Sequence, residues 1–359
     1  METNTSKLAL GRAAVSAAVI IKFGLDWHAT QVTGCRQIDG QLPQPSQKLS
    51  EEQLLALVAD HIARGHRVFT CYEAGACGYQ LHRKVTALGA VNFVVAPRRW
   101  DERGQRVKTD KRDARELCQR LDRYLAGNTA AFTIVYVPTP HQEQVRALCR
   151  QRATVMKERQ RCELRGYGLM LAQGIQAPGG WWQPDEWSTL APQLPAWLRE
   201  HVERWQRDAV RLEAELAQLT PRIEALSAGK RAPKGLGALS AAILESEIMD
   251  WSRFTNRRQP GSYSGLCPSE DSSNRRRRQG SVNKHGNAQV RHLLVEAIWR
   301  MIEWQPDYPP VKKVRATAPK SRARRRAVVA AARRLMVDLW RIHTGRQSPE
   351  QLKLLMVIL

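Results

Sequence analysis

The stretch Lys108-Thr109-Asp110-Lys111-Arg112-Asp113-Ala114-Arg115-Glu116-Leu117 places two carboxylates one helical turn apart within a run of cations. Apolar residues continue at helical spacing from Ala114 to Leu125, so the stretch predicts a helix whose buried face also carries Asp110 and Asp113. Two like charges about 4 Å apart repel by roughly 4 kcal/mol at an effective dielectric constant of 20, so an inward-facing pair needs a proton, an arginine or a metal ion. The alternative is that both acids only complement the helix dipole, with Thr109 as the N-cap.

The first 136 residues predict an α/β domain around this helix. Strands are predicted at residues 19–25, 31–38, near 47, 67–72 and 91–96. Ser50 predicts the start of a helix, with Gln53 completing a capping box, and a further helix is predicted over residues 79–88. This order predicts a partly parallel sheet, whose ligands lie beyond the carboxyl ends of the strands.

Two further acids fall at the ends of predicted strands. Asp26 and Glu73 each follow a buried run, and the helix that carries Asp110 and Asp113 packs on the same edge of the sheet. Carboxylate oxygens are the ligands that Mg²⁺ prefers, at about 2.0 to 2.1 Å, and a bound divalent ion bridges readily to a phosphate. The sequence therefore predicts a Mg²⁺ site made by the four acids.

The charge of the chain indicates a polyanionic partner. Its 359 residues carry 57 Lys and Arg against 34 Asp and Glu, a formal net charge of +23. Nucleic acid and an anionic membrane are the usual candidates. The apolar segment over residues 8–21 is interrupted by Arg12 and followed by Lys22, so it is too short to span a bilayer.

The cysteines indicate the compartment. Seven cysteines are scattered, odd in number and without C-x-x-C pairs, so they predict neither a disulfide framework nor a zinc site. Lys7 precedes an alanine-rich apolar run, and this pattern also fits a secretory signal. We expect a reducing cytoplasm, because the cysteine pattern fits it better.

Residues 137–230 predict a helical arm. One long helix reaches from Pro138 toward Leu171, and a loop rich in Gly, Pro and Trp follows. Apolar residues then recur in steps of four and three from Leu198, the pattern of a coiled-coil seam, which we expect Pro221 to interrupt after Leu219. An antiparallel arm used for self-association is one interpretation, and an ordinary core-facing helix is the other.

Residues 231–359 predict a mainly helical domain. Pro233-Lys234-Gly235-Leu236-Gly237 precedes an apolar helix, as in helix-hairpin-helix modules whose glycine N–H groups contact a phosphate. A predicted loop of hydroxyls, small residues and cations then runs from Tyr263 to Asn287, before a helix over residues 288–304. Such a loop indicates contact with phosphate, although a serine in a loop is more commonly a turn or cap residue.

Six motifs in order carry a resemblance to a known family. They are G-L-D at Asp26, Y-E-A-G at Glu73, K-T-D-x-x-D-A at Asp110 and Asp113, G-L-G at Gly235, G-L-x-P followed by S-S, and G-x-x-x-K-x-G-N ending at Asn287. The chain resembles the DEDD transposases of the insertion-sequence one-ten family, in its eleven-eleven branch, known as bridge-RNA-guided or seekRNA-guided serine recombinases.

The resemblance implies an α/β plus all-α fold of three domains. These are a RuvC-like, ribonuclease-H-type domain (1–136), a coiled-coil helical arm (137–230) and a mainly helical transposase domain with a nucleophilic serine (231–359). The four acids match the metal ligands of the family. The serine aligns with Ser273, and the adjacent Ser272 leaves the register open by one residue.

The resemblance also implies a mechanism and partners. Ser273 would attack a DNA phosphodiester, assisted by Mg²⁺, to form a covalent phosphoserine and later rejoin donor and target DNA. A structured non-coding guide RNA would direct a dimer or tetramer, which can share its active site between protomers, in the bacterial cytoplasm and at the nucleoid. The expected nucleic-acid contacts are Lys234, Gly235, Gly237, Arg275, Arg276, Arg277, Arg278, Lys284, Asn287 and Arg291.

Two other functions are open from the residues. One is a metal-dependent, RuvC-like structure-specific endonuclease of the Holliday-junction resolvase type, with water as the nucleophile in place of Ser273. The other is a non-catalytic RNA- or DNA-binding protein, for which Asp26 and Glu73 would be dispensable.

Overall fold

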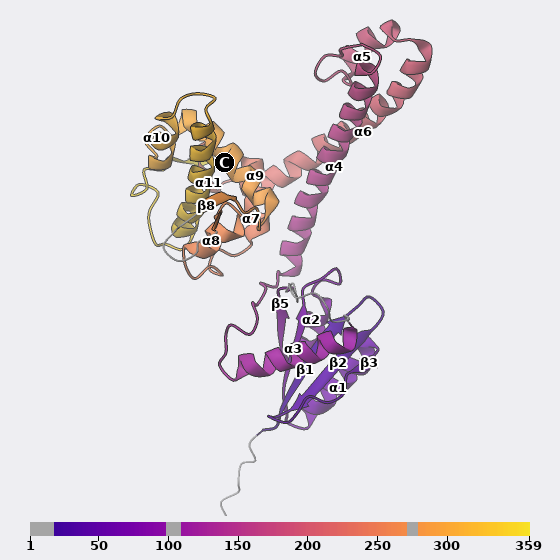
Figure 1. Cartoon of the computed structure of the whole chain (residues 1–359), viewed down its shortest axis with the longest axis vertical. Helices are drawn as coiled ribbons and strands as arrows, with labels where there is room; N and C mark the ends of the chain where they lie inside the picture. Colours follow the sequence, from indigo (N-terminus) through magenta and orange to yellow (C-terminus); the bar gives the residue numbers. More distant parts are fainter. Residues whose placement is uncertain (1–17, 98–108, 271–278) are drawn as a thin grey trace, which may run out of the picture. The chain divides into compact units, whose positions relative to one another are not determined.

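The computed structural model describes residues 18–97, 109–270 and 279–359. The chain divides into two compact units, Met1–Val137 and Pro138–Leu359 (Figure 1). Our first predicted boundary, after residue 136, lies beside this division. The predicted arm and the predicted C-terminal domain both fall within the second unit.

The first unit is built on a five-stranded mixed sheet. Its strands are β1 (Ile20–Trp27), β2 (Val32–Ile38), β3 (Gln47–Leu49), β4 (Arg67–Glu73) and β5 (Val91–Val95), in the order β3-β2-β1-β4-β5. β1 pairs with β4, and β4 with β5, in parallel, while the β1–β2 and β2–β3 pairs are antiparallel. The predicted α/β class and partly parallel sheet are confirmed.

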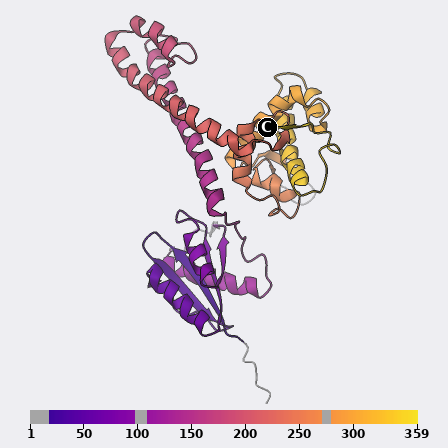
Figure 2. The same cartoon turned by 180° about the vertical axis from the view of Figure 1, so that it is seen from behind.

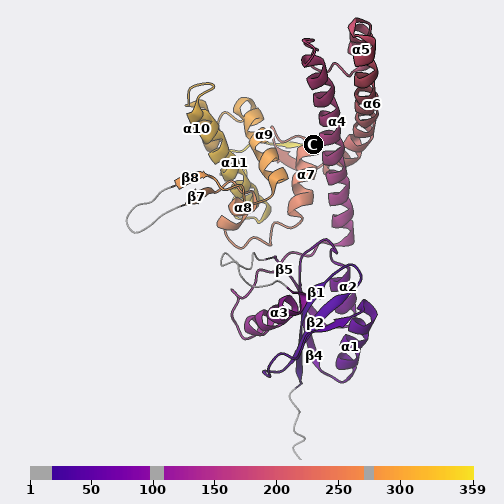
Figure 3. The same ribbon diagram turned by 45° about the vertical axis from the view of Figure 1, so that its right-hand side comes forward.

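Helices cover both faces of this sheet. They are α1 (Glu51–Ala63), α2 (Gln80–Ala87) and α3 (Asp110–Leu125). α1 and α2 pack on one face and α3 lies on the other (Figure 3). The predicted capping box is present, because Ser50 Oγ accepts from Gln53 N at 3.1 Å and Gln53 Oε1 accepts from Ser50 N at 2.9 Å.

A single glycine lets α3 lie against β1. A Cβ atom added at Gly24 would stand 2.1 Å from Cys118 N and 2.3 Å from Ala114 O, so no side chain fits there. Two residues earlier on the same strand face, Lys22 makes an ion pair with Asp122 of α3. Two residues later, Asp26 therefore faces the first turn of α3. The predicted buried face of α3 is confirmed, with Ala114, Leu117, Cys118 and Leu121 all buried.

Two long helices begin the second unit. α4 (Pro140–Leu171) and α6 (Ala196–Glu224) run antiparallel along each other, with α5 (Pro184–Leu190) and the 3₁₀ turn η1 (Ala191–Gln193) between them (Figures 1 and 2). Our expectation that Pro221 interrupts the second helix was wrong, because α6 continues to Glu224 and Ile223 is fully buried. Proline lacks only its own N–H donor, so α6 loses one hydrogen bond at Pro221 and continues for about one more turn.

The rest of the second unit is mainly helical. Its elements are η2 (Ala225–Ser227), β6 (Arg231–Pro233), α7 (Ala238–Ile248), α8 (Arg258–Tyr263), β7 (Pro268–Glu270), β8 (Gln279–Val282), α9 (Ala288–Trp304), α10 (Pro309–Arg315), α11 (Arg322–His343) and β9 (Met356–Ile358). The predicted loop after Tyr263 is a partial error, because β7 and β8 pair within it. Over the described ranges, no helix combines the length and apolar character needed to cross a membrane.

We predict that Gly24→Ala destabilises the first unit by about 3 kcal/mol, because the new methyl group would collide with the backbone of α3 and force it outward. Urea unfolding of the full chain, with hydrogen exchange read at the α3 amides, measures this effect. Gly34→Ala in β2 is the matched control. Its methyl group would meet only Leu25 Cδ2 at 3.5 Å and Leu49 Cδ1 at 3.7 Å, so equal losses in the two variants would contradict the close-contact argument.

Candidate active site

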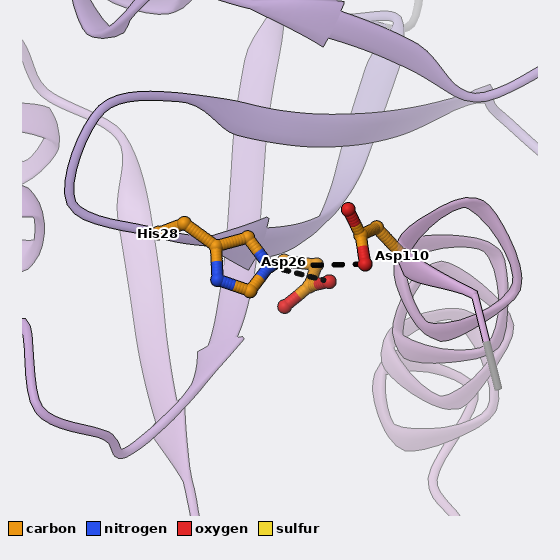
Figure 4. A group of neighbouring side chains, drawn as sticks. All are labelled: Asp26, His28 and Asp110. Atoms are coloured by element: carbon orange, nitrogen blue, oxygen red, sulfur yellow. Dashed lines mark hydrogen bonds and ion pairs between the residues drawn. The ribbon is translucent and has the colours of Figure 1, made fainter.

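Two of the four predicted acids meet at one edge of the sheet. Asp26, at the end of β1, and Asp110, the first residue of α3, lie together with His28 (Figure 4). His28 Nε2 is 3.3 Å from Asp26 Oδ2 and 3.9 Å from Asp110 Oδ1, and one ligand atom from each of the three side chains lies within 4.8 Å of the other two. The side chains are partly exposed, at 23% for Asp26, 43% for Asp110 and 50% for His28, so a ligand can reach them.

The other two acids lie on neighbouring positions. β4 runs parallel to β1 with Leu25 opposite Tyr72, so Glu73 ends β4 beside Asp26. Asp113 is half-buried, one turn after Asp110. Within residues 18–97, 109–270 and 279–359, the group able to share one ion contains neither Glu73 nor Asp113. Their role as ligands stays a prediction.

A buried arginine stands beside Glu73. Arg120 Nη1 is 3.9 Å from Glu73 Oε1, and the Arg120 side chain is only 4% exposed. Its Nε donates to the carbonyl of Ala131 at 2.8 Å. Inward-facing carboxylates are stabilised by a proton, an arginine or a metal ion, and Arg120 provides the arginine for Glu73.

The donor set suits a divalent cation. Asp26 and Asp110 offer carboxylate oxygens, which favour Mg²⁺, and an imidazole nitrogen is accepted by several divalent metals. Thr109 stands at the N-cap position of α3, but its hydroxyl makes no capping hydrogen bond. The alternative, in which both acids merely belong to a capped helix start, leaves the convergence of Asp110 with Asp26 from another element unexplained.

The predicted serine loop of the second unit is partly described. Ser272, Ser273 and Arg275 to Arg278 lie outside the described residues. The strands that flank them pair antiparallel, with Pro268 opposite Val282 and Glu270 opposite Gln279. Glu270 and Gln279 therefore lie side by side.

Two motif glycines pack backbone to backbone near these strands. A Cβ atom at Gly286 would lie 2.4 Å from Gly265 N, and Gly265 has a φ of +65°, which favours glycine. Arg291 Nη1 donates to the carbonyl of Ser264 at 3.4 Å across this contact and to the carbonyl of Lys284 at 3.2 Å on its own side. The G-L-x-P and K-x-G-N motifs thus form one structural element.

The predicted hairpin before α7 is also packed internally. Gly235 has a φ of +104°, and a Cβ atom there would lie 2.9 Å from Met301 Cγ of α9. Lys234 Nζ lies 4.4 Å from the centroid of the Trp304 ring. Gly237 is exposed at the start of α7. Contacts of Lys234, Gly235 and Gly237 with nucleic acid stay predictions.

Comparison with known proteins identifies the family. The model of the IS116/IS110/IS902 transposase family matches residues 231–312. The protein y4rJ of Sinorhizobium fredii, named as a transposase, is 30% identical over 302 residues, which cover 75% of this chain and 75% of y4rJ. The chain belongs to the IS116/IS110/IS902 transposase family.

Other relatives agree with this membership. The transposase y4qE of Sinorhizobium fredii is 31% identical over 260 residues, and the match spans 69% of this chain but 61% of y4qE. The transposase for insertion sequence element IS1111A of Coxiella burnetii is 24% identical over 296 residues, 77% of this chain and 79% of that protein. The predicted insertion-sequence one-ten family is confirmed, while its guide RNA and serine chemistry stay predictions.

A buried carboxylate ties the family-matched region of this transposase to α4. Glu247 of α7 is 0% exposed and accepts hydrogen bonds from Arg150 Nε at 3.0 Å, Arg146 Nη2 at 3.2 Å and Asn287 Nδ2 at 2.6 Å. Asn287 also caps α9, since its Oδ1 accepts from the N–H groups of Gln289 and Val290. Asn287 and Arg291 therefore have internal structural roles, and their predicted contacts with nucleic acid stay predictions.

The environment of Glu247 favours its charged form. Burial alone would raise the pKa of this carboxyl, but the hydrogen bond from Arg150, the charge of Arg146 and the hydrogen bond from Asn287 outweigh it and hold the pKa below its ordinary value. A lowered pKa contributes stability that is present above the ordinary pKa and is lost as the pH falls through the lowered one.

We predict that Glu247→Gln lowers the free energy of unfolding by about 3 kcal/mol at pH 7. The reason is that Arg146 and Arg150 lose the buried carboxylate that balances their charges. The difference from the unmodified chain should shrink as the pH falls below the ordinary glutamate pKa of about 4.3 and through the lowered pKa of Glu247. Urea unfolding across that range measures it. Glu245→Gln, two residues earlier on the same helix, removes a more exposed carboxylate that pairs with Lys230 and should cost under about 1 kcal/mol at every pH.

Proposed function

We propose that this chain is an RNA-guided DNA transposase that cuts and rejoins donor and target DNA. The observation that supports this most directly is the meeting of Asp26 and Asp110, from two separate elements, at an accessible edge of the sheet. Membership of a transposase family makes DNA the substrate class, and a net charge of +23 suits a nucleic-acid partner. The mixed sheet of the first unit is consistent with a RuvC-like domain.

The acids would hold the metal. Asp26 and Asp110 provide the converging oxygens, Glu73 and Asp113 lie on adjoining positions, and His28 restrains the Asp26 carboxylate from 3.3 Å. Mg²⁺ bound there would supply positive charge against the negative charge that develops on a phosphate under attack. Arg120 beside Glu73 offsets part of the acids' mutual repulsion.

The nucleophile would come from the second unit. The Ser273 hydroxyl oxygen attacks phosphorus, the bond from phosphorus to the 3′ oxygen breaks, and the hydroxyl proton ends on that oxygen. The products are a 5′-phosphoserine and a free 3′-hydroxyl, and the reverse step on a partner strand rejoins DNA. One phosphoester replaces another, so the reaction needs no nucleotide cofactor.

Guide RNA and oligomerisation complete the proposal. Pairing of RNA with donor and target DNA would supply sequence choice, while the protein grips backbones. The acids and the serine lie in different units of the chain, so a dimer or tetramer could assemble the site from two protomers. Sequencing of RNA that copurifies with the chain tests the guide, and its absence from recombination-competent protein would exclude it.

We predict that a suicide DNA substrate traps a covalent adduct with the unmodified chain and that Ser273→Ala abolishes it, because the attacking oxygen is removed. Denaturing gel electrophoresis with labelled DNA detects the adduct. Ser272→Ala is the control and should retain most of it. Cleavage that persists without adduct in Ser273→Ala would support a metal-dependent endonuclease instead, and loss of adduct only in Ser272→Ala would move the nucleophile by one residue.

We predict that Asp26→Asn and Asp110→Asn each lower Mg²⁺-dependent cleavage on the order of 100-fold, because the site loses part of the charge that holds the cation. A chelator should abolish cleavage and added Mg²⁺ should restore it. Titration of Mn²⁺ by paramagnetic resonance reports binding independently of activity. Asp60→Asn on α1, an exposed acid paired with Arg64, makes the same charge change elsewhere and should leave both readouts intact. Full cleavage by both site variants would sink the metal site.

A further inference from the structure

An arginine-lined groove runs along α11 in the second unit. One cavity of about 860 Å³ lies between α11 and the β7–β8 pair, and another of about 320 Å³ lies between α11 and α8. Both are lined by Ala330 and Arg333, so they adjoin along α11, and we call the two together the α11 groove. Figure 3 shows β7, β8 and α8 beside α11.

The spacing of residues on α11 explains the shape of the groove. Arg322, Arg325 and Arg326 line its first part, Arg333 its centre and Arg341 its far end. Steps of three, four, seven and eight keep side chains on one helix face. The nineteen steps from Arg322 to Arg341, at 1.5 Å each, give a length of about 28 Å. Small and apolar side chains form the floor, among them Leu266, Val329 and Ala330.

Most of the cations in the groove have no counter-charge. Arg334 and Arg341 pair with Asp338, at 2.9 Å and 3.1 Å, and Asp338 is 1% exposed. The described residues provide no ion-pair partner for the other arginines that line the groove, which are Arg257, Arg258, Arg322, Arg325, Arg326 and Arg333. Neither cavity has an Asp or Glu among its described lining residues. An extended row of guanidinium groups is repulsive by itself and is stabilised by a polyanion.

The chemistry of the groove fits a phosphodiester backbone. Guanidinium groups match phosphate oxygens with paired hydrogen bonds. A length of about 28 Å exceeds what a single phosphate or small anion needs and approaches one turn of duplex DNA, about 34 Å. One wall consists of Pro268 of β7 with Gly280, Ser281 and Val282 around β8. The chain between these strands carries Ser273, so a strand held in the groove passes beside the attachment points of that segment.

We propose that the α11 groove binds the phosphate backbone of the DNA strand that the transposase cleaves. The choice of that strand rests on the proposed function, whereas the groove's affinity for DNA does not. Arg325, Arg326 and Arg333 supply the central contacts, and the apolar floor lies against the sugars of the bound strand.

The test measures binding of duplex DNA to the full chain carrying Ser273→Ala, so that chemistry does not contribute. Replacing Arg325, Arg326 and Arg333 with Gln should reduce the slope of log K against log salt by about 2 to 3, since each phosphate contact contributes about 0.9. The affinity should fall on the order of 100-fold at 0.1 M salt, and less at higher salt. Replacing the same three with Lys should retain most of the slope.

A matched control removes three arginines elsewhere. Arg199, Arg207 and Arg211 are exposed on α6, and their replacement with Gln changes net charge equally. An equal fall in slope for this control, or an unchanged slope for the groove variant, would overturn the proposal. So would a fall for RNA of the same sequence with none for DNA. Groove-dependent binding together with adduct in Ser273→Ala would uphold the groove while refuting Ser273 as the nucleophile.

Discussion

The contact between α3 and β1 at Gly24 is the constraint on which the first unit depends. Backbone atoms of Ala114 and Cys118 occupy the volume that any side chain at residue 24 would need. The middle of α3 therefore packs directly on the backbone of Gly24, and the ion pair of Lys22 with Asp122 holds the C-terminal part of the helix. With those two points set, the other end of the helix has to bring Asp110 over the last residues of β1. The acidic pair is a consequence of close packing.

The second unit uses glycine in the same way. Gly265 and Gly286 touch through their backbones, which brings β7 and the start of α9 together, and Gly235 fits its turn against Met301. In each unit a motif glycine comes shortly before a residue with a proposed chemical role. Gly24 precedes Asp26 in the first unit, and Gly265 precedes Ser273 in the second. Such glycines are easily read as ligand-binding positions. The packing shows that Gly24, Gly265 and Gly286 instead set how closely the elements that carry those residues approach.

Much of the fold was predictable because its signals are local. The capping box at Ser50, the buried runs of the strands and the apolar face of α3 each depend on a few neighbouring residues, and the structure confirms them. Asp26 and Asp110 were predicted together because strand ends and helix starts can be placed from such patterns. His28 was not predicted, because only the course of the turn after β1 brings its ring beside Asp26 and Asp110. Arg120 was missed although it lies on the same helix stripe as Asp113 and Leu117. Its burial can be expected only when its partner Glu73 is known, and Glu73 lies on a strand distant in the sequence.

The two units have different electrostatic roles in the proposed reaction. In the proposed mechanism, Asp26 and Asp110 would repel a phosphate unless a cation were held between them, so the region around these two acids would contribute little attraction for DNA. The second unit carries the row of guanidinium groups along α11 with no acid among its described lining residues, so its attraction comes from counterion release and weakens with salt. Affinity and cleavage should therefore respond to different ions, the first to monovalent salt and the second to the divalent cation. A nuclease that used only the acids would also need such cations to hold DNA, so the α11 groove supports DNA binding by the second unit under either reaction.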